Sequence, residues 1–580
     1  MKKILLALMA LTGLVSCTMD FYRSDTMTSN KLKEDPGAAV YTTDGNYSLF
    51  KDVLMYNNSE YSNNTYVRHW FQMTEFRGDN ICLSGRTEDP LYEATTYSDN
   101  PTLYNLSYFW YLSYKIIYGA NSNIESIREG ASVESDHMLG ENYCMRALAH
   151  LNLSVLYSRP YTRGKDNPGV VLRTSTDCSV TERATVGQVY EQVVRDLKKA
   201  AELMKAGSRR GNAGYISYDT ARGLLTRAYL YMGMYDECIE LAGEMLGSDP
   251  ASHLDTDLAN YFINARDSKE TLWCVGKIKT DKGYVPKSQI GSMDYDGDGA
   301  GWGGIYYSDP LIELYNRFPE DLRFKAYYSQ LSPTNDGKMM VHWPLIDEVN
   351  AFRGNVVLHG LVKDASKETA ENTGYSVTYD GKNYDILRKT VDDGTVNYIT
   401  GYTTDDKDND GFTGGTRVYL RPNVSAGAGV RQTYPKYLMS KFSWQDGDPM
   451  LSSPVMIRWA EVILNRAEAY AHKGNVDAAL NDVNVIRNRA GLTGEAEMKA
   501  SNMAARGYED VLDVVLDERR LELCFEGFRA FDLYRNGKSI DRRYAGVQDW
   551  EILTPERLDK DYPYCIPYDE VSVSGIANNK

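Results

Sequence analysis

The sequence lacks the short motifs by which most enzymes are recognised. It has neither the Gly-x-Ser-x-Gly turn of a nucleophilic serine nor the His-Glu-x-x-His helix of a catalytic zinc. Residues 299–304 read Gly-x-Gly-x-x-Gly, but they follow acidic residues that would repel a pyrophosphate, so a dinucleotide site is excluded. Gly537-Lys538-Ser539 ends like a phosphate-binding loop, yet Asp532 stands where such a loop needs glycine. We therefore expect a protein that is not an enzyme and that requires no cofactor.

Paired cysteines, an excess of basic residues and long internal apolar runs are also missing. The eight cysteines include no Cys-x-x-Cys pair, so neither a disulfide framework nor a zinc site is indicated. The net charge of -16 argues against nucleic acid or an anionic membrane surface as a partner. Beyond the N-terminus, no stretch approaches the roughly 20 apolar residues that a transmembrane helix needs.

The N-terminus predicts export and a lipid anchor. Lys2-Lys3 precedes an apolar run that ends at Leu14, as in a secretory signal peptide. The four residues 14–17 then resemble a lipoprotein box, which implies cleavage before Cys17 and lipidation of that residue. Residues 1–16 are thus the predicted signal peptide and residues 17–35 a lipidated tether. A conventional signal peptide with a chance cysteine is the alternative.

Tyrosine is the residue in marked excess. The chain has 45 Tyr against 14 Phe and 8 Trp, within a composition otherwise typical of a globular protein. A tyrosine ring offers a flat apolar face and a hydroxyl tip, which suit sugar or peptide surfaces, although half-buried tyrosines are also common.

Two stretches have the pattern of a helical hairpin. Residues 456–491 place apolar residues at helical spacing on both sides of Gly474, and so short a connection makes the two helices antiparallel. Residues 218–246 show the same arrangement around Gly233. The two hairpins form a degenerate internal repeat of tetratricopeptide character. Further helices are expected over residues 38–56, 64–76 and 107–128, and after the capping residue Thr185.

A third helix is expected after the C-terminal hairpin, from near Tyr508 to Arg535. Its charges recur at spacings of three, as Glu526 with Arg529 and Asp532 with Arg535. Such spacing predicts a salt-bridged helix surface.

The middle of the chain, residues 250–453, has a different character. It is rich in Gly, Asp, Tyr and Thr, with short runs such as Thr271–Val275 and Arg417–Leu420 that predict brief strands. We expect a loop-rich region carried on the helical scaffold, and loops on a rigid scaffold are where binding residues concentrate.

Two acidic runs in this region match the first half of a calcium loop. Alternate carboxylates converge in such a loop, and a glycine permits its turn. Ile305 and Arg417 stand where the closing glutamate is needed, so neither run is a complete EF-hand loop. Calcium with ligands from elsewhere and a solvated acidic turn both remain open. The candidate ligands are Asp294, Asp296 and Asp298 in the first run and Asp406, Asp408 and Asp410 in the second.

Several strings in the helical parts carry a family resemblance. The C-terminal ones are Arg458-x-x-Glu461-x-x-Leu464-x-Arg466-Ala-Glu-Ala and Glu518-Arg-Arg-x-Glu522-Leu-x-Phe525-Glu-Gly-x-Arg529-x-x-Asp532-Leu. Together they resemble the C-terminal signature of the SusD/RagB family of outer-membrane nutrient-binding lipoproteins. Three more strings resemble other patterns of the same family: Trp110-x-x-x-Tyr114-x-x-Ile117, Glu141-x-x-x-Met145-Arg146-Ala147-x-x-His150 and Tyr564-Cys-Ile-Pro567.

The resemblance implies a mainly α, SusD-like fold of tetratricopeptide-like helix pairs with a loop-rich, short-strand insertion. Residues 36–580 would form one domain, with the scaffold at about 36–249 and 454–580 and the variable ligand-binding region at about 250–453. It also implies a lipid-anchored protein, exposed on the outer membrane, that captures a glycan and delivers it to a SusC-like TonB-dependent transporter. A peptide or glycopeptide ligand in the same role, or a surface glycoside hydrolase, is the alternative.

In the resembling family, ligand contacts come from a loop near the N-terminal helices and from the middle region. These correspond here to residues 82–105 and to about 284–343. The family pattern does not extend to single contacts, and packing in the core or in a loop is the alternative for each residue. The candidates chosen within the two regions are Arg86, Tyr92, Tyr97, Trp302, Tyr306, Tyr307 and Trp343.

Overall fold

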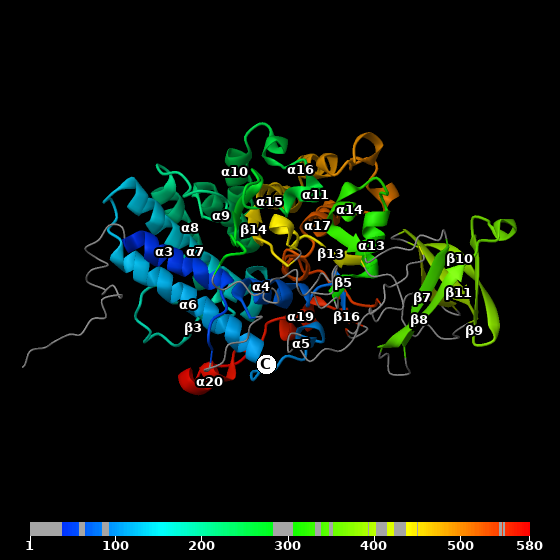
Figure 1. Cartoon of the computed structure of the whole chain (residues 1–580), viewed down its shortest axis with the longest axis horizontal. Coiled ribbons are helices and arrows are strands. Elements are labelled where there is room, and N and C mark those ends of the chain that lie inside the picture. Colours follow the sequence, from blue (N-terminus) through cyan, green and yellow to red (C-terminus); the bar gives the residue numbers. More distant parts are fainter. Residues whose placement is uncertain are drawn as a thin grey trace, which may run out of the picture.

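A computed structural model shows a helical body with a β-sheet lobe at one end (Figure 1). It describes residues 38–56, 64–83, 92–281, 305–330, 338–346, 352–391, 394–401, 415–422, 437–448, 450–544, 548 and 551–579. The sheet lobe comprises the described residues between 338 and 422, and the helical body comprises the rest.

The N-terminal half of the body is built from long helices that begin at capping side chains. Thr65, Ser132, Thr185 and Ser217 each accept a hydrogen bond from a backbone N–H in the first turn of the helix that follows, which satisfies a group that has no partner within the helix. The cap predicted at Thr185 is confirmed. The helices are α3 (Ala38–Lys51), α4 (Tyr66–Glu75), α5 (Tyr92–Thr95), α6 (Tyr104–Ser126), α7 (Val133–Tyr157), α8 (Val186–Met204), α9 (Tyr218–Met232), α10 (Tyr235–Leu246) and α11 (Leu258–Tyr261).

The C-terminal helices complete the same body. They are α13 (Asp309–Asn316), α14 (Leu322–Tyr327), α15 (Trp459–His472), α16 (Val476–Arg489), α17 (Val511–Leu523), α18 (Arg529–Arg535), α19 (Pro555–Asp561) and α20 (Tyr568–Ser574). Short two-stranded sheets tie distant segments together: β1 (Ile81–Leu83) with β5 (Ile305–Tyr307), β2 (Pro168–Val171) with β3 (Arg183–Thr185), β4 (Thr271–Cys274) with β14 (Val455–Arg458), β6 (Tyr328–Gln330) with β13 (Tyr437–Met439), and β15 (Ile540–Asp541) with β16 (Ile552–Leu553).

The two predicted hairpins are confirmed, and they pack against each other. Gly233 and Gly474 both have φ of +72°, a left-handed conformation that lets each first helix end and the next begin. α9 and α10 both contact α15, and the buried pair of Arg227 with Glu461 joins α9 to α15 at 2.6 Å. Segments more than 200 residues apart in the chain therefore form one scaffold.

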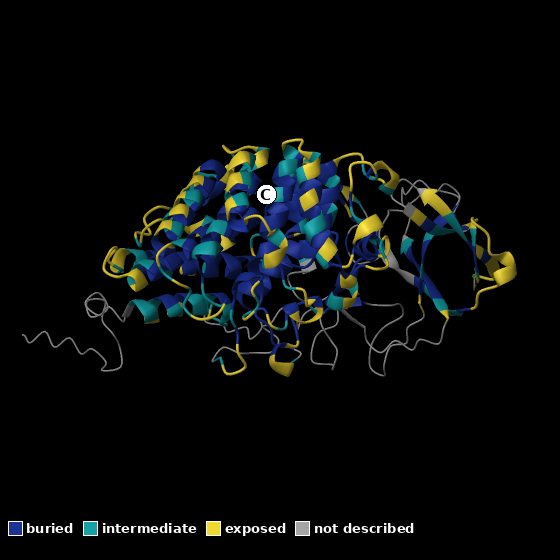
Figure 2. Cartoon of the chain, turned by 90° about the horizontal axis from the view of Figure 1, so that it is seen from above, coloured by how far each residue is buried: buried dark blue, intermediate teal, exposed yellow. Residues whose placement is uncertain are grey.

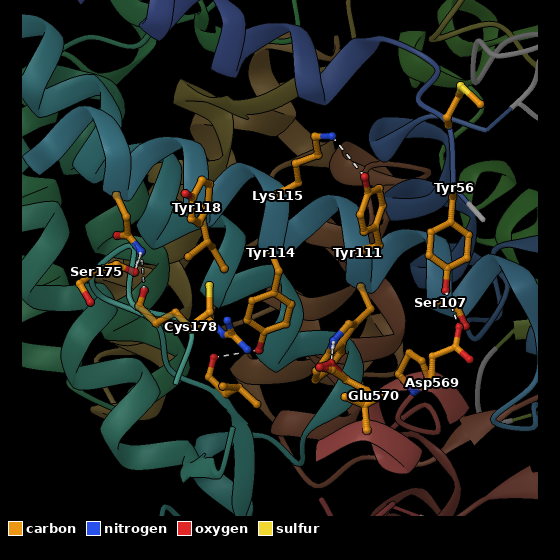
Figure 3. A pocket seen from close by; sticks show the side chains of 18 residues that line it. Tyr56, Ser107, Tyr111, Tyr114, Lys115, Tyr118, Ser175, Cys178, Asp569 and Glu570 are labelled. Carbon is orange, nitrogen blue, oxygen red and sulfur yellow. Dashed lines mark hydrogen bonds between the residues drawn. The ribbon is translucent and has the colours of Figure 1, made fainter. Parts of the chain in front are cut away.

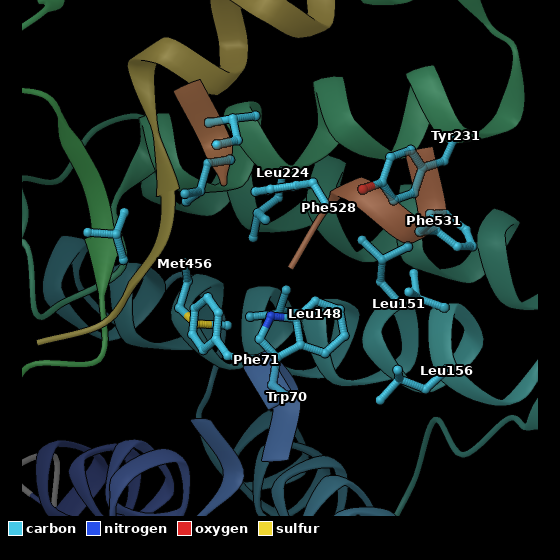
Figure 4. Packing of buried hydrophobic residues seen from close by; sticks show 14 of the residues in the cluster. Trp70, Phe71, Leu148, Leu151, Leu156, Leu224, Tyr231, Met456, Phe528 and Phe531 are labelled. Atoms are coloured by element: carbon cyan, nitrogen blue, oxygen red, sulfur yellow. The ribbon is translucent and has the colours of Figure 1, made fainter. Parts of the chain in front are cut away.

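A large hydrophobic core runs through the body, beside a smaller cluster among α15, α16 and α17. Figure 4 shows Trp70 and Phe71 of α4 in the same cluster as Leu148 of α7, Met456 of β14 and Phe531 of α18. Burial of such large side chains is the main favourable term in folding, at about 25 cal/mol per Å² of apolar surface. Since the cluster draws on both ends of the chain, neither end has a complete core alone.

The predicted third helix is wrong in its length. The structure ends α17 at Leu523 and starts α18 at Arg529, with Phe525 and Gly527 in left-handed conformations between them. A Cβ on Gly527 would lie 2.9 Å from Oγ1 of Thr74 on α4, so this turn also allows a close approach. The break was not predicted, because the spacing of the charges is helical across it.

The predicted salt-bridged surface is also wrong, because these charges are buried. Glu526 pairs with Arg458 at 2.8 Å and with Lys441 at 2.9 Å, and Arg529 pairs with Asp79 at 2.9 Å. Asp532 does pair with Arg535 at 2.6 Å, but inside the protein. The family signature thus encodes an internal charge network.

Arg458 stands at the centre of that network. It also contacts Glu270 at 2.7 Å and Glu522 at 2.6 Å, and Arg489 contacts the same two glutamates. The surrounding guanidinium groups hold the pKa of Glu522 well below its usual value, against the opposing effect of burial. The network therefore joins β4, β14, α16 and α17.

The sheet lobe has its own fold. Its strands are β7 (Met339–Ile346), β8 (Phe352–Leu361), β9 (Asn372–Tyr379), β10 (Lys382–Val391), β11 (Gly394–Thr400) and β12 (Gly415–Pro422), in the antiparallel order β8-β7-β12-β11-β10-β9. A separate hydrophobic cluster, which includes Trp343, Ile386 and Ile399, lies within it. Figure 2 shows buried stretches in the strands of the lobe, apart from the buried helices of the body. The predicted strands at 271–275 and 417–420 are confirmed, but most of this region's strands were missed.

The lobe leaves and rejoins the body through neighbouring strands. Met339 near the start of β7 is the register partner of Pro422 at the end of β12. Beside them, Arg421 pairs with Asp309 of α13 at 2.7 Å, and Arg417 pairs with Glu313 at 2.7 Å. These two ion pairs join the lobe to the body.

Candidate functional site

The structure describes only part of the site predicted from the sequence. Arg86, Trp302 and both acidic runs, 294–298 and 406–410, lie outside the described residues. Tyr92 is the first residue of α5, and its side chain is likewise outside what is described. Calcium binding and these ligand contacts therefore stay predictions.

Four predicted contact residues are buried, which favours the alternative that they pack in a core. The exposed fractions are 9% for Tyr97, 1% for Tyr306, 2% for Tyr307 and 0% for Trp343. Tyr97 donates its hydroxyl to the Arg77 carbonyl at 2.7 Å. Tyr307 packs against the protein core, and Trp343 fills the centre of the sheet lobe. Burial of a large aromatic ring contributes a large favourable free energy, so such a ring can be packed in a core even where the sequence predicts a loop.

The two predicted ligand regions nevertheless meet at one sheet. Leu83, the last residue of β1, is the register partner of Ile305, the first residue of β5. The first region continues beyond Leu83, and the second arrives at Ile305. Their described ends are therefore side by side, although they are more than 200 residues apart in the sequence.

A groove of about 790 Å³ lies on α6 (Figure 3). Its floor is one face of α6, and its walls come from the chain after β2 and from α20. It is lined by Met55, Tyr56, Ser107, Trp110, Tyr111, Tyr114, Lys115, Ile117, Tyr118, Asn121, Val171, Arg173, Ser175, Cys178, Pro567, Asp569, Glu570 and Val573.

Aromatic rings follow the helix along the groove. Tyr111, Tyr114 and Tyr118 recur at spacings of three and four, which places them on one face of α6. Tyr118 has an exposed fraction of 51%, whereas Tyr111 and Tyr114 are half-buried. The groove thus presents partly exposed ring faces rather than fully packed ones.

Hydrogen bonds fix two of these rings. Tyr114 donates its hydroxyl to the Val171 carbonyl at 2.8 Å, and the indole N–H of Trp110 donates to Oε2 of Glu570 at 3.3 Å. Burial and the nearby Glu570 raise the pKa of Tyr114, so its hydroxyl stays protonated at neutral pH. Rings held in this way are ordered before a ligand arrives, which lowers the entropy cost of binding.

Charged groups of both signs lie along the aromatic strip. Lys115 donates to the Tyr111 hydroxyl at 3.2 Å, and the Arg173 guanidinium lies 5.7 Å from the Tyr114 ring centre. On the α20 side, Asp569 accepts the Tyr56 hydroxyl at 3.1 Å. Ring faces combined with a few fixed polar groups suit non-covalent recognition of a ligand.

The groove adjoins one of the predicted ligand regions. Tyr568 of α20 donates its backbone N–H to the Pro101 carbonyl at 2.8 Å, and the Tyr104 ring lies 5.3 Å from that of Tyr56. Residues 82–105 therefore end at the groove.

The groove residues were not among the predicted contacts, because Trp110, Tyr114 and Ile117 were interpreted only as part of a family pattern. Trp110 is indeed buried, with an exposed fraction of 5%. The overlooked signal is the set Tyr111, Tyr114 and Tyr118, which recur at helical spacing and bring three hydroxyls to one face.

The described residues contain no group of three or more His, Cys, Asp or Glu side chains placed to hold a metal ion. Among the helices described, none combines the length and the apolar character needed to cross a membrane.

Comparison with known families gives two matches along the chain. The SusD family model matches residues 263–565, more than half of the sequence. A second model, described as starch-binding associating with outer membrane, matches residues 52–230. A relative from Formosa agariphila, SusD-like protein P38, is 22% identical over 487 residues, which cover 81% of this chain and 80% of that protein.

Solved structures share the fold. A SusD superfamily protein from Bacteroides thetaiotaomicron has a TM-score of 0.66 and 20% identity, with 94% of this chain and 99% of that one covered. A putative sugar binding protein from Bacteroides vulgatus has a TM-score of 0.61 and 18% identity, with 94% and 98% covered. These likenesses confirm the mainly helical architecture.

Proposed function

The chain belongs to the SusD family, and from that premise we propose that it captures oligosaccharide or polysaccharide and delivers it to a SusC-like TonB-dependent transporter. The observation that carries the proposal is the groove on α6, with its partly exposed tyrosines beside fixed polar groups. Pyranose rings have apolar faces and polar edges, and they match such a surface. The matched family description, which names starch binding and the outer membrane, supports the same role.

The proposed location is the outer-membrane surface, with Cys17 as the lipid anchor. A lipidated N-terminus and a polar tether over residues 17–35 would hold the body outside the bilayer. Replacing Cys17 with alanine should release the protein from the membrane fraction and abolish incorporation of labelled fatty acid. Labelling that persists in the variant would contradict the anchor.

Binding by the soluble protein, truncated after Cys17, tests capture. Electrophoresis through gels that contain single polysaccharides should show retarded migration on at least one of them. Tyr118→Ala should weaken this binding about tenfold, because it removes the most exposed ring of the groove. Tyr41→Ala is the matched control, since Tyr41 is 71% exposed on α3 and does not line the groove.

The alternatives predict different results in the same assay. Release of reducing ends from the bound polysaccharide would show a glycoside hydrolase. Binding of peptides or glycopeptides with no polysaccharide binding would show the rival ligand class. Polysaccharide binding that is weakened by Trp302→Ala and not by Tyr118→Ala would keep the function and move the site to the region chosen from the sequence.

A further inference from the structure

Two cations in the groove on α6 have no carboxylate partner among the described residues. Among the described residues, neither Lys115 nor Arg173 forms a salt bridge, although Lys115 has the Tyr111 hydroxyl as its hydrogen-bond acceptor. Arg163, which is half-buried as Arg173 is, pairs with Asp559. A half-buried cation left without an anion, as Arg173 is, favours an incoming one.

Arg173 is held in place by its backbone while its side chain is left free to bind. Its N–H donates to Nε2 of His150 at 3.3 Å, and its carbonyl accepts from Asn121 at 3.3 Å. Its side-chain Nε is buried and has no acceptor in the described structure. A buried donor without an acceptor carries a desolvation cost that a ligand oxygen would remove.

The acidic residues of the groove are already satisfied by the protein. Asp569 accepts the Tyr56 hydroxyl, and Glu570 accepts the Trp110 indole N–H. Both lie in the first turn of α20, where the helix dipole favours a carboxylate. Both carboxylates therefore already accept a hydrogen bond from the protein, whereas the Nε of Arg173 has no acceptor in the described structure.

We propose that the groove selects an acidic saccharide, one that carries carboxylate or sulfate groups on its sugar rings. The Arg173 guanidinium would bind the anionic group through its planar set of donors, Lys115 would supply a second positive charge, and the tyrosines would stack on the rings. The net charge of -16 repels anions at long range, so the selectivity has to come from these local contacts. This inference rests on the proposed function.

Matched acidic and neutral glycans test the charge separately from the sugar. The probes are oligogalacturonate with its methyl ester, glucuronoxylan with unsubstituted xylan, and a sulfated galactan with its desulfated form. We expect at least one acidic member to bind about tenfold or more tightly than its neutral partner, with an affinity that falls as salt rises. Comparing the three pairs distinguishes carboxylate from sulfate.

Charge-removing variants locate the selectivity. Arg173→Gln and Lys115→Gln should each weaken binding of the acidic partner by a larger factor than binding of the neutral partner, so that the acidic-to-neutral preference falls several-fold. Lys198→Gln is the control, because Lys198 is an exposed lysine 5.8 Å from the Tyr229 ring centre, outside the groove. Circular dichroism confirms that each variant is folded.

The possible failures are distinct. Equal binding of acidic and neutral partners, still weakened by Tyr118→Ala, would overturn the acidic preference and leave glycan capture standing. A preference that both glutamine variants retain would also overturn the inference. Failure of every glycan to bind would instead overturn the proposed function, and binding of peptides in their place would identify the other ligand class.

Discussion

The helical body and the sheet lobe are stabilised in different ways. The body is closed by a large hydrophobic core and by buried ion pairs that connect distant segments, such as Arg458 with Glu270 and Glu522. The lobe has a small core of its own and meets α13 through the pairs of Arg421 and Arg417. The body is therefore cooperative over most of the chain, whereas the lobe is a local unit.

This difference separates the part of the molecule that contains the quoted family signature from the part that does not. The residues that carry the family signature lie in the body's charge network, and the groove on α6 also belongs to the body. The lobe contributes no residue to the lining of that groove. Four predictions test whether the two regions are as independent as this description requires.

The largest effect is expected from Arg458→Ala in the body. The change leaves Glu270, Glu522 and Glu526 without a central cation inside the protein. The cost to the free energy of unfolding should be about 3–5 kcal/mol, measured by denaturant titration. Lys199→Ala, which breaks an exposed pair with Glu129, is the control and should cost less than about 1 kcal/mol. Equal effects of the two changes would contradict the central role of the network.

A large, pH-dependent effect on stability is expected where the lobe meets the body, at His342 of β7. Burial lowers the pKa of His342 to about 4, with Asp309 opposing and Arg421 reinforcing that shift. The unfolded chain takes up a proton near pH 6.5 and the folded lobe does not, so stability is lost as the pH falls from about 6.5 to about 4. The loss should reach about 3 kcal/mol, and His342→Gln should remove it.

The measurement is the difference in unfolding free energy between His342→Gln and the native chain at pH 7 and pH 4.5. The difference is needed because His69 and His150 in the body also have pKa values lowered to about 3 by burial. A difference that does not change with pH would show that His342 is accessible to protons in the folded lobe.

A smaller and strictly local effect is expected from Ile399→Val. Ile399 is fully buried in the core of the lobe, and loss of one methylene should cost about 1 kcal/mol. Hydrogen exchange should become faster in β11 and β12 and remain unchanged in α15. Val483→Ala in the body is the counterpart, and it should make hydrogen exchange faster in α15 and leave it unchanged in β11 and β12. Faster exchange throughout the chain in both variants would mean that the regions unfold together.

The smallest effect on binding is expected from removal of the lobe. Because Met339 and Pro422 are register partners, a short Gly-Ser linker can replace residues 339–422 without stretching the body. Glycan affinity should change less than about twofold, since the groove is intact. A larger loss of affinity, in a protein whose helical circular dichroism is retained, would place part of the binding site in the lobe.

Local periodicity predicted most of the helical scaffold. The features that it did not predict depend on packing between segments that are distant in the sequence. The hairpins around Gly233 and Gly474 follow from apolar spacing and a glycine at the turn. The charges of residues 518–535 suit an exposed helix equally well, and only contacts with Arg458, Lys441 and Asp79 bury them. Partners this distant in sequence leave no local pattern.

The candidate site was harder to predict for a related reason. A tyrosine serves in a core, as Tyr307 does, or in a groove, as Tyr118 does, and the residue type is the same. What separates them is whether other segments cover the ring. Tyr307 is covered by its neighbours in the core, whereas Tyr118 faces the open groove. The lobe was underestimated because its strands alternate with polar residues, which resembles loop composition.

The buried charges around Arg458 also constrain how this sequence can evolve. Loss of Arg458 alone removes one cation partner from each of three glutamates, and loss of Glu526 alone leaves both Arg458 and Lys441 with a missing partner. Substitutions that survive selection must therefore arrive in compensating sets, spread over segments as distant as residues 270 and 526. Across homologous chains, these positions should covary more strongly than their neighbours in the hydrophobic core, where volume alone has to be preserved.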